Sequence, residues 1–193
     1  MGSDFFEQKR PHNGLTPAQY MAHFRAEIEK GESDKLDYLK LNWQRSHRIE
    51  KTYTVSDELR ATIEAITEPQ LWMVLTEPWC GDSAQNLGYI IKMAACNPKI
   101  DLRILLRDQN LDIMDQYLTN GKRGIPKLVA FAADGKELFR WGPRPAAAQA
   151  IFDEGKAAGQ EKEEIMKAMH LWYGRNRGKA LEQEFLALLK RDF

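Results

Sequence analysis

The sequence has few cysteines, no long apolar run and no excess of charge of either sign. The 193 residues include only two cysteines, Cys80 and Cys96. Two are too few for a disulfide framework, and their spacing is not that of a metal site. No apolar stretch approaches the roughly 20 residues that span a bilayer. The N-terminus lacks the basic and apolar segments of a signal peptide. We therefore expect a cytoplasmic protein with reduced thiols and no membrane contact.

The balance of charge argues against a general nucleic-acid-binding protein. The chain has 28 basic and 28 acidic residues, for a formal net charge of +0. A general nucleic-acid binder would need an excess of positive charge to neutralise phosphates, so we expect no nucleic-acid partner. With 43% hydrophobic and 29% charged residues, the composition is that of a folded globular chain. The length suits one domain with an extension.

The first third of the sequence predicts helices. Thr16 and Pro17 form a typical helix start, and the helical pattern runs to Gly31. Two more helices are predicted after Ser33 and after Ser56, and the segment 48–53 between them is compatible with a short strand. Their predicted inner faces are Leu36, Leu39 and Trp43 in the second helix and Leu59, Ile63 and Ile66 in the third.

The middle of the sequence predicts strands. Short apolar runs indicate strands at 71–76, 100–106, 127–132 and 136–141, with helices from Cys80 to Asn97 and at 110–118 between them. The first intervening helix makes the first two strands parallel, and the two-residue turn Asp134-Gly135 makes the last pair antiparallel. Helices follow at 145–158, 160–173 and 177–190, with Gly159 and Gly174 as C-caps.

This order of elements predicts an α/β fold. We expect a mixed four-stranded sheet, with room for a fifth short strand, sandwiched by helices. We assign residues 1–66 to a helical N-terminal extension, 67–158 to the core and 159–193 to C-terminal helices packed on the core. The sequence leaves a homodimer open.

The segment around Cys80 is the most informative part of the sequence. Residues 76–83 read Thr-Glu-Pro-Trp-Cys-Gly-Asp-Ser and place a cysteine where a buried strand turns into a helix. Free N–H groups and the dipole at the helix N-terminus favour the thiolate, which is the nucleophile. The Ser83 hydroxyl can donate a hydrogen bond to the sulfur, whereas the Asp82 carboxylate opposes ionisation of the thiol. The sequence does not rank these effects.

Two motifs resemble landmarks of the thioredoxin family. Residues 79–83, Trp-Cys-Gly-Asp-Ser, resemble the Trp-Cys-Gly-x-Cys segment of the family, and Gly124-Ile125-Pro126 resembles its cis-proline loop. The resemblance covers residues 68–150 and is closer to a bacterial branch of thioredoxin-like proteins with a helical N-terminal extension. It implies a thioredoxin-like fold, a reactive Cys80, and a cis Pro126 that lies beside the sulfur and contacts the substrate backbone.

The departures from the family pattern change the expected chemistry. Ser83 stands where the family has its resolving cysteine, and Val74 stands where thioredoxins have a buried aspartate as proton acceptor. Cys96 lies 16 residues further along the predicted helix. That is about 24 Å at ~1.5 Å per residue, whereas a disulfide needs Cα atoms within about 7 Å. An external thiol must therefore release any mixed disulfide that Cys80 forms.

We predict thiol–disulfide exchange by a single cysteine, with Cys80 and Ser83 as the catalytic residues. The expected partner is a protein or small-molecule disulfide, and glutathione or another small thiol is the expected co-substrate. We expect no metal and no organic cofactor. The predicted substrate-binding residues are Trp79, Gly81, Lys122, Arg123, Ile125 and Pro126.

Two alternatives stay open at the level of sequence. The fold can serve as a peptide-binding module without turnover, or it can carry a transferase or peroxide-reducing enzyme in which Cys80 forms a sulfenic acid. Cys96 is expected to be a packed thiol. We expect Arg45, Arg48 and Lys51 on a solvated helix face, with a part in a pocket as the alternative, and regard Arg144 as a weak pocket candidate. None of His12, His23, His47 and His170 is expected to act as a ligand or base.

Overall fold

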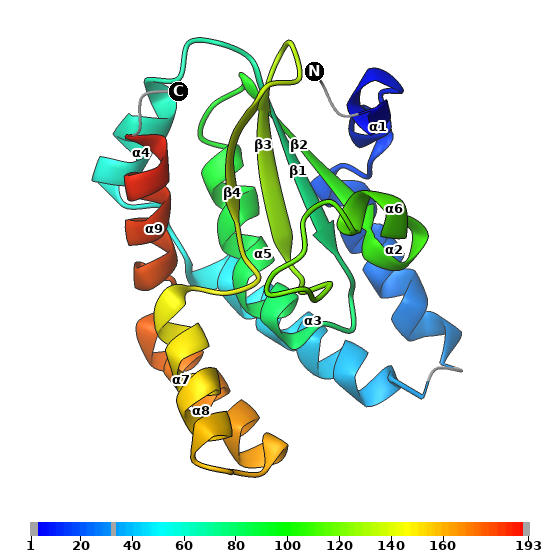
Figure 1. Cartoon of the computed structure of the whole chain (residues 1–193), viewed down its shortest axis with the longest axis vertical. Coiled ribbons are helices and arrows are strands. Elements are labelled where there is room, and N and C mark those ends of the chain that lie inside the picture. Colours follow the sequence, from blue (N-terminus) through cyan, green and yellow to red (C-terminus); the bar gives the residue numbers. More distant parts are fainter. Residues whose placement is uncertain (1–3, 32–33, 191–193) are drawn as a thin grey trace.

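Four strands form one mixed sheet at the centre of the computed structural model, which describes residues 4–31 and 34–190 (Figure 1). The order across the sheet is β2-β1-β3-β4, where β1 pairs parallel to β2 and β3 runs antiparallel to both β1 and β4. The predicted α/β fold class is therefore confirmed. The strands are β1 (Gln70–Thr76), β2 (Ile100–Leu106), β3 (Lys127–Ala132) and β4 (Glu137–Trp141).

Strand β1 is buried on both sides because helices cover both faces of the sheet. Its side chains alternate, so that Trp72 and Val74 join one hydrophobic cluster, whereas Met73 and Leu75 join another on the opposite face. All four side chains are fully buried. An apolar run without polar alternation is typical of such a doubly covered strand, which explains why this segment could be predicted.

The larger helical layer shares a cluster with Trp72 and Val74. This layer contains helices from the N-terminal, central and C-terminal parts of the chain. The helices of the two terminal extensions therefore share one hydrophobic core with the sheet. These helices are α2 (Pro17–Lys30), α3 (Leu36–Thr52), α4 (Asp57–Glu64), α5 (Gly81–Ala94) and α9 (Lys179–Leu189).

The opposite face of the sheet is covered by short elements. They are α1 (Asp4–Glu7), η1 (Pro11–Asn13), η2 (Arg107–Gln109) and α6 (Leu111–Met114). Phe5 and Phe6 of α1 lie against Phe131 of β3, with ring centroids 6.3 and 5.0 Å away. No helix was predicted for this N-terminal segment, although its two aromatic residues are buried.

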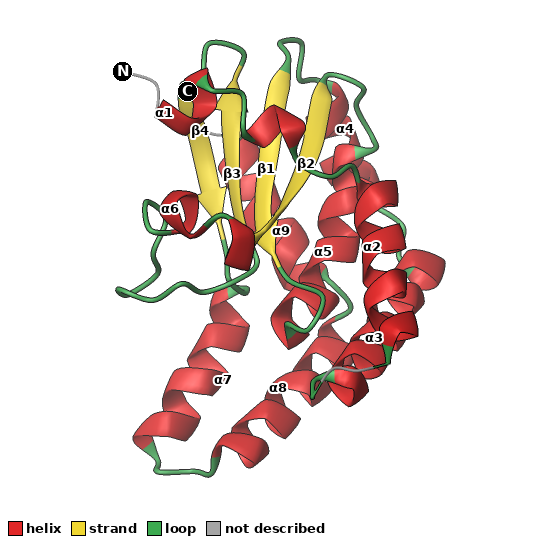
Figure 2. Ribbon diagram, turned by 90° about the vertical axis from the view of Figure 1, so that its right-hand side faces the viewer, coloured by secondary structure: helices red, strands yellow, loops and turns green. Residues whose placement is uncertain are grey.

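The remaining two helices extend beyond the end of the sheet as an antiparallel pair (Figure 2). They are α7 (Ala146–Ala157) and α8 (Lys162–Asn176). Ala148 of α7 and Ile165, Met169 and Tyr173 of α8 form a small hydrophobic cluster of their own. Within the described residues, no helix has the length and apolar character needed to cross a membrane.

Several predicted boundaries were wrong. The segment 48–52 is the end of α3 and not a strand, because Ile49 continues the buried face that begins with Leu39. Helix α8 runs through Gly174 to Asn176 and is capped by Arg177, with φ of 52°. The second predicted helix is α3, which begins at Leu36 after a turn at 34–35, whereas Ser33 itself lies outside the described residues.

The predicted helix at 110–118 is much shorter in the structure. Helix α6 ends at Met114, and its buried residues are Ile113 and Met114, whereas the apolar Leu111 and Leu118 of the predicted segment are 37% and 41% exposed. The chain then turns back, with a bridge between Thr119 and Lys122. The spacing of apolar residues in this short segment therefore did not distinguish the buried residues from the exposed ones.

Within the described residues the sheet has no fifth strand, but an isolated bridge lies at its β2 edge. Leu15 and Ile104 exchange both backbone hydrogen bonds, each at 2.8 Å, beside the edge strand β2. The chain continues directly into α2, which Thr16 caps together with the Gln19 side chain. The predicted capping of α2 by Thr16 is therefore confirmed, and the edge of β2 is partly covered.

Helices α3 and α5 approach each other closely at Gly88. A Cβ atom at Gly88 would lie 2.9 Å from Ile49 Cγ2, closer than carbon atoms normally pack. The absence of a side chain at this position therefore sets the separation of the two helices. This contact fixes α3 of the N-terminal extension against the helix that follows Cys80.

Candidate active site

Cys80 lies between the end of β1 and the start of α5, at the N-cap position of the helix. Its Sγ donates a hydrogen bond of 3.3 Å to the carbonyl oxygen of Ile125, and the Ile125–Pro126 peptide bond is cis. Because β1 and β3 are neighbours in the sheet, the end of β1 and the start of β3 meet at one edge. The two motifs that resemble the thioredoxin family are thus brought together.

Ser83 is hydrogen-bonded to a buried hydroxyl group. Thr76 Oγ1 donates a 2.7 Å hydrogen bond to Ser83 Oγ, and Ser83 acts to lower the pKa of the neighbouring Cys80. The buried Tyr20 of α2 lies close to Thr76 and interacts electrostatically with Cys80. Tyr20 belongs to the N-terminal extension and was not among the predicted site residues. Its distance in the sequence from the Cys80 motif left no local signal for this contact.

Asp82 forms a buried polar network with the C-terminal part of the chain. The Asp82 residue as a whole is 6% exposed, and its carboxylate accepts hydrogen bonds of 2.6 Å from Arg144 and 2.9 Å from Tyr173. Asn86 donates to the Tyr173 hydroxyl and to the Asp82 carbonyl. Burial raises the pKa of Asp82, whereas the charge of Arg144 opposes the shift. The network links the Cys80 turn to α8 and to the segment before α7.

Burial dominates the electrostatics of the Cys80 thiol. It raises the pKa of Cys80, and the negative charge of Asp82 raises it further. Hydrogen bonds from Ser83 act in the opposite direction without reversing the shift. A protonated thiol agrees with the hydrogen bond that Cys80 donates to Ile125. In the structure, burial and the Asp82 charge therefore outweigh the groups that favour the Cys80 thiolate, an order that the sequence did not give.

Trp79 and Gly81 flank the cysteine on its other side. The half-buried Trp79 ring contacts two cations, with Lys35 Nζ at 4.5 Å and the Arg107 guanidinium at 4.8 Å from its centroid. A Cβ atom at Gly81 would lie 3.4 Å from the His170 ring. The backbone of the motif thus faces α3 and α8.

Lys122 and Arg123 lie on the exposed loop before the cis-proline. Arg123 forms a two-pronged ion pair with Asp115, at 2.6 and 2.7 Å, and its backbone carbonyl accepts a hydrogen bond from Arg107. The Lys122 backbone closes the turn with Thr119. The Arg123 guanidinium is therefore directed to a neighbouring carboxylate.

Cys96 lies beyond the opposite end of α5. Both cysteines are free, and Cys96 Sγ donates to the carbonyl of Lys92 at 3.3 Å. Helix α5 separates the two sulfur atoms along its length. Among the described residues, no group of three His, Cys, Asp or Glu side chains could hold a metal ion.

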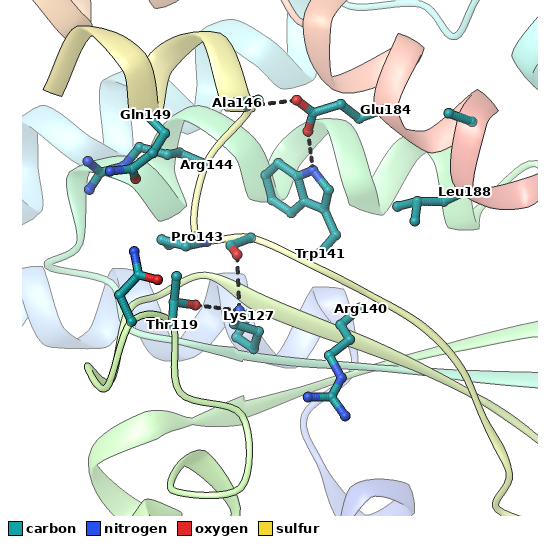
Figure 3. Close-up of a pocket in the computed structure, with 13 residues that line it drawn as sticks. Thr119, Lys127, Arg140, Trp141, Pro143, Arg144, Ala146, Gln149, Glu184 and Leu188 are labelled. Carbon is teal, nitrogen blue, oxygen red and sulfur yellow. Dashed lines mark hydrogen bonds between the residues drawn. The ribbon is translucent and has the colours of Figure 1, made fainter. Parts of the chain in front are cut away.

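Lys127 holds the loops around Pro126 together. Figure 3 shows its buried ammonium group between Thr119 and the segment before Pro143, where Nζ donates to Thr119 Oγ1 at 2.6 Å and to the Gly142 carbonyl at 3.0 Å. Gly142 also packs on the Pro126 carbonyl so closely that a Cβ atom would lie 2.1 Å from that oxygen. Its φ of 108° is a further reason for glycine at this position.

The protonation of Lys127 gives a testable dependence of stability on pH. Burial, with a smaller contribution from Arg140, lowers the pKa of Lys127 from 10.5 to about 8. Between these values the unfolded chain binds more protons at this lysine than the folded chain does. The free energy of unfolding, relative to a Lys127→Met variant, should therefore rise as the pH increases from 8 towards 10.5. Urea denaturation of both proteins over this range measures the difference, and a difference that falls with pH would contradict this assignment.

The sheet order, the cysteine at the N-terminus of α5 and the cis-proline beside it define the class of thioredoxin-like α/β proteins. A family model described as thioredoxin matches residues 30–158, and the chain belongs to the thioredoxin family. The matched region includes α3 as well as the sheet.

Two solved structures are similar over most of the chain. An HIV epitope-scaffold protein shares 21% identity, covers 92% of this chain and 93% of its own, and has a TM-score of 0.57. A protein of unknown function from Pseudomonas aeruginosa shares 20% identity, covers 91% of this chain and 98% of its own, and has the same TM-score of 0.57. At this level of identity the likeness shows the fold alone. No curated protein matches the chain.

Proposed function

We propose that the protein carries out thiol–disulfide exchange through Cys80 alone. The observation that carries the proposal is the position of the sulfur, at the N-cap of α5 and 3.3 Å from the carbonyl that precedes the cis Pro126. A disulfide lying along the Pro126 loop would present its sulfur atoms to Cys80. Ser83 occupies the place of a resolving cysteine, and Cys96 lies at the far end of the helix.

The proposed reaction has two exchange steps. The Cys80 thiol first loses its proton to solvent, and the thiolate attacks one sulfur of the substrate disulfide. The new sulfur–sulfur bond joins Cys80 to half of the substrate, and the other half leaves as a thiolate that takes up a proton. The thiolate of an external small thiol, such as glutathione, then attacks the substrate sulfur of the mixed disulfide. This step releases a mixed disulfide of substrate and small thiol and regenerates Cys80.

The neighbouring residues have separate roles in this proposal. Ser83, oriented by Thr76, donates to the sulfur while it is negatively charged. The Ile125 carbonyl, which the resting thiol occupies, becomes free to accept a backbone N–H group of an extended substrate when the thiol ionises. Pro126 fixes the direction of that carbonyl. Trp79 and Gly81 form the opposite side of the substrate site.

Cysteine variants test the proposal directly. We expect the protein to reduce hydroxyethyl disulfide in the presence of excess glutathione, because Cys80 forms the mixed disulfide that glutathione releases. Cys80→Ala should lower the rate to that of the reaction without protein, whereas Cys96→Ala should leave it within about twofold, because Cys96 makes no contact with the site. Mass spectrometry of the intermediate should locate the adduct on Cys80 in the Cys96→Ala variant.

Two outcomes would overturn this proposal. Equal turnover by the wild type and Cys80→Ala would exclude the cysteine as the nucleophile. Peroxide consumption that depends on Cys80, without disulfide reduction, would instead identify a peroxide-reducing enzyme.

A peptide-binding module is the second candidate, and the raised pKa of Cys80 favours it. A half-buried thiol that stays protonated is a weak nucleophile, so the Pro126 loop would hold an extended peptide without turnover. Under this candidate, Cys80→Ala would retain peptide binding, and the wild type would not react with any small disulfide even at alkaline pH. The alkylation rate of Cys80 against pH separates the two functions.

A further inference from the structure

A groove opens beside the Cys80 motif, between α3 and α8. Its volume is about 960 Å³, and its floor includes Trp79 and Gly81, the two residues on either side of Cys80. We call it the α3–α8 groove. Its polar lining consists of Lys35 and Arg45 from the α3 side and Lys162, Glu163, Lys167 and His170 from the α8 side.

The lining of the α3–α8 groove carries mainly positive charge. Four cationic side chains line it against the single carboxylate of Glu163. Burial, and the nearby charge of Arg45, lower the pKa of His170 to about 4, so this ring is neutral at pH 7. An excess of one charge within a concave surface raises the local concentration of oppositely charged ligands. The whole chain has a balanced charge, so this concentration of cations is local.

Among the cations of the α3–α8 groove, Arg45 is held in place by a hydrogen bond. Its Nη1 donates a hydrogen bond of 3.0 Å to Asn42 Oδ1, and the buried Asn42 amide donates to the carbonyl of Pro78 at 3.1 Å. A Cβ atom at Gly81 would lie 3.5 Å from Arg45 Nη1, which places the guanidinium beside the active-site turn. The expectation that Arg45 lies on a solvated helix face was therefore wrong. Asn42 thus links the Arg45 guanidinium to the turn that carries Cys80.

The groove also offers apolar surface next to its cations. Tyr38 and Leu41 of α3 line it and are 65% and 42% exposed, and Met166 of α8 lines the other side. Its volume is in the range of small-molecule sites, which are about 300–1,000 Å³. A groove of this size, with apolar walls and cations near a thiol, fits a small ligand with an apolar body and negatively charged ends.

We infer that the α3–α8 groove binds the carboxylate groups of a small anionic thiol or disulfide that reacts at Cys80. This inference rests on the proposed exchange function and specifies its substrate class. The cations of α3 and α8 bind the carboxylates, and Trp79 and Gly81 form the path from the groove to the sulfur. Both helices lie outside the sheet and α5, so the N-terminal and C-terminal extensions together create the specificity.

Three small disulfides of different charge test the inference. Dithiodiglycolate is anionic, hydroxyethyl disulfide is neutral and cystamine is cationic, and all three are of similar size. The rate constants for their reaction with Cys80 are measured in a Cys96→Ala background, with and without Lys162→Gln and Lys167→Gln together. We expect the anionic-to-cationic rate ratio to fall by about tenfold or more in the double variant, because steering by charge changes rates by about 10–1,000-fold. The neutral disulfide should react at an unchanged rate.

A matched variant controls for the loss of two positive charges. Lys40→Gln and Lys156→Gln together remove one exposed lysine from α3 and one from α7, neither of which lines the groove. This variant should keep the wild-type rate ratio, and added salt should reduce the ratio in the wild type more than in the groove variant. Equal ratios in the two double variants would overturn the inference while leaving exchange by Cys80 intact. Failure of all three disulfides to react would instead overturn the proposed function.

Discussion

Replacement of Arg144 by methionine should lower the free energy of unfolding by about 3–5 kcal/mol, because it leaves a buried carboxylate without its cation. The Arg144 and Asp82 side chains are 14% and 7% exposed, and their ion pair is 2.6 Å long. Methionine retains much of the apolar contact that Arg144 makes with the Phe152 ring. Urea denaturation at neutral pH measures the loss.

An exposed ion pair provides the control. Arg123 and Asp115 are both 46% exposed, so Arg123→Met should lower the free energy of unfolding much less than Arg144→Met does. Replacing both members of the buried pair, with Arg144→Met and Asp82→Leu, should restore part of the stability lost in the single variant. Equal losses for the buried and exposed single variants would show that the buried pair has no special role in stability.

Replacement of Asp82 by asparagine should lower the pKa of Cys80 and speed its reactions at neutral pH. The Asp82 charge is the second cause, after burial, of the raised pKa of Cys80, and asparagine removes it. Asparagine can also keep hydrogen bonds to Arg144 and Tyr173 because it has the same shape. Below the pKa, each unit of downward shift increases the thiolate fraction about tenfold. The alkylation rate against pH, in a Cys96→Ala background, gives the pKa directly.

Ser83→Ala provides the opposite comparison. The Ser83 hydrogen bond lowers the pKa of Cys80, so its removal should move the inflection of the alkylation profile to higher pH. Thermal unfolding of both variants shows whether the fold is retained. An Asp82→Asn inflection that stays in place or moves upward would contradict the electrostatic role assigned to Asp82.

The parts of the fold that were predicted depend on local signals. The apolar run that became β1 and the Asp134-Gly135 turn are encoded in neighbouring residues, and so is the Thr16 cap of α2. The link between Cys80 and the loop at Pro126 came from a resemblance in two motifs, and the structure places the sulfur 3.3 Å from the Ile125 carbonyl. The functional roles of these residues remain predictions.

The parts that were missed depend on contacts between distant segments. Asp82 is 62 residues from Arg144 and 91 from Tyr173, and no local pattern records that these side chains meet. The burial of the thiol, which decides the direction of its pKa shift, also requires the packed structure. The sequence left the placement of Arg45 undecided for the same reason, since its cationic side chain is compatible with solvent as well as with a groove.

The contact at Gly88 has a consequence for ligand recognition. Arg45 and Ile49 are one turn apart in α3, so the glycine that lets Ile49 approach α5 also determines how far Arg45 lies from the Cys80 turn. A methyl group added at Gly88 would push α3 away from α5 and so change the width of the α3–α8 groove without altering any charge. If the α3–α8 groove binds small thiols as proposed, a substitution at Gly88 should therefore change ligand preference from a position that no ligand touches.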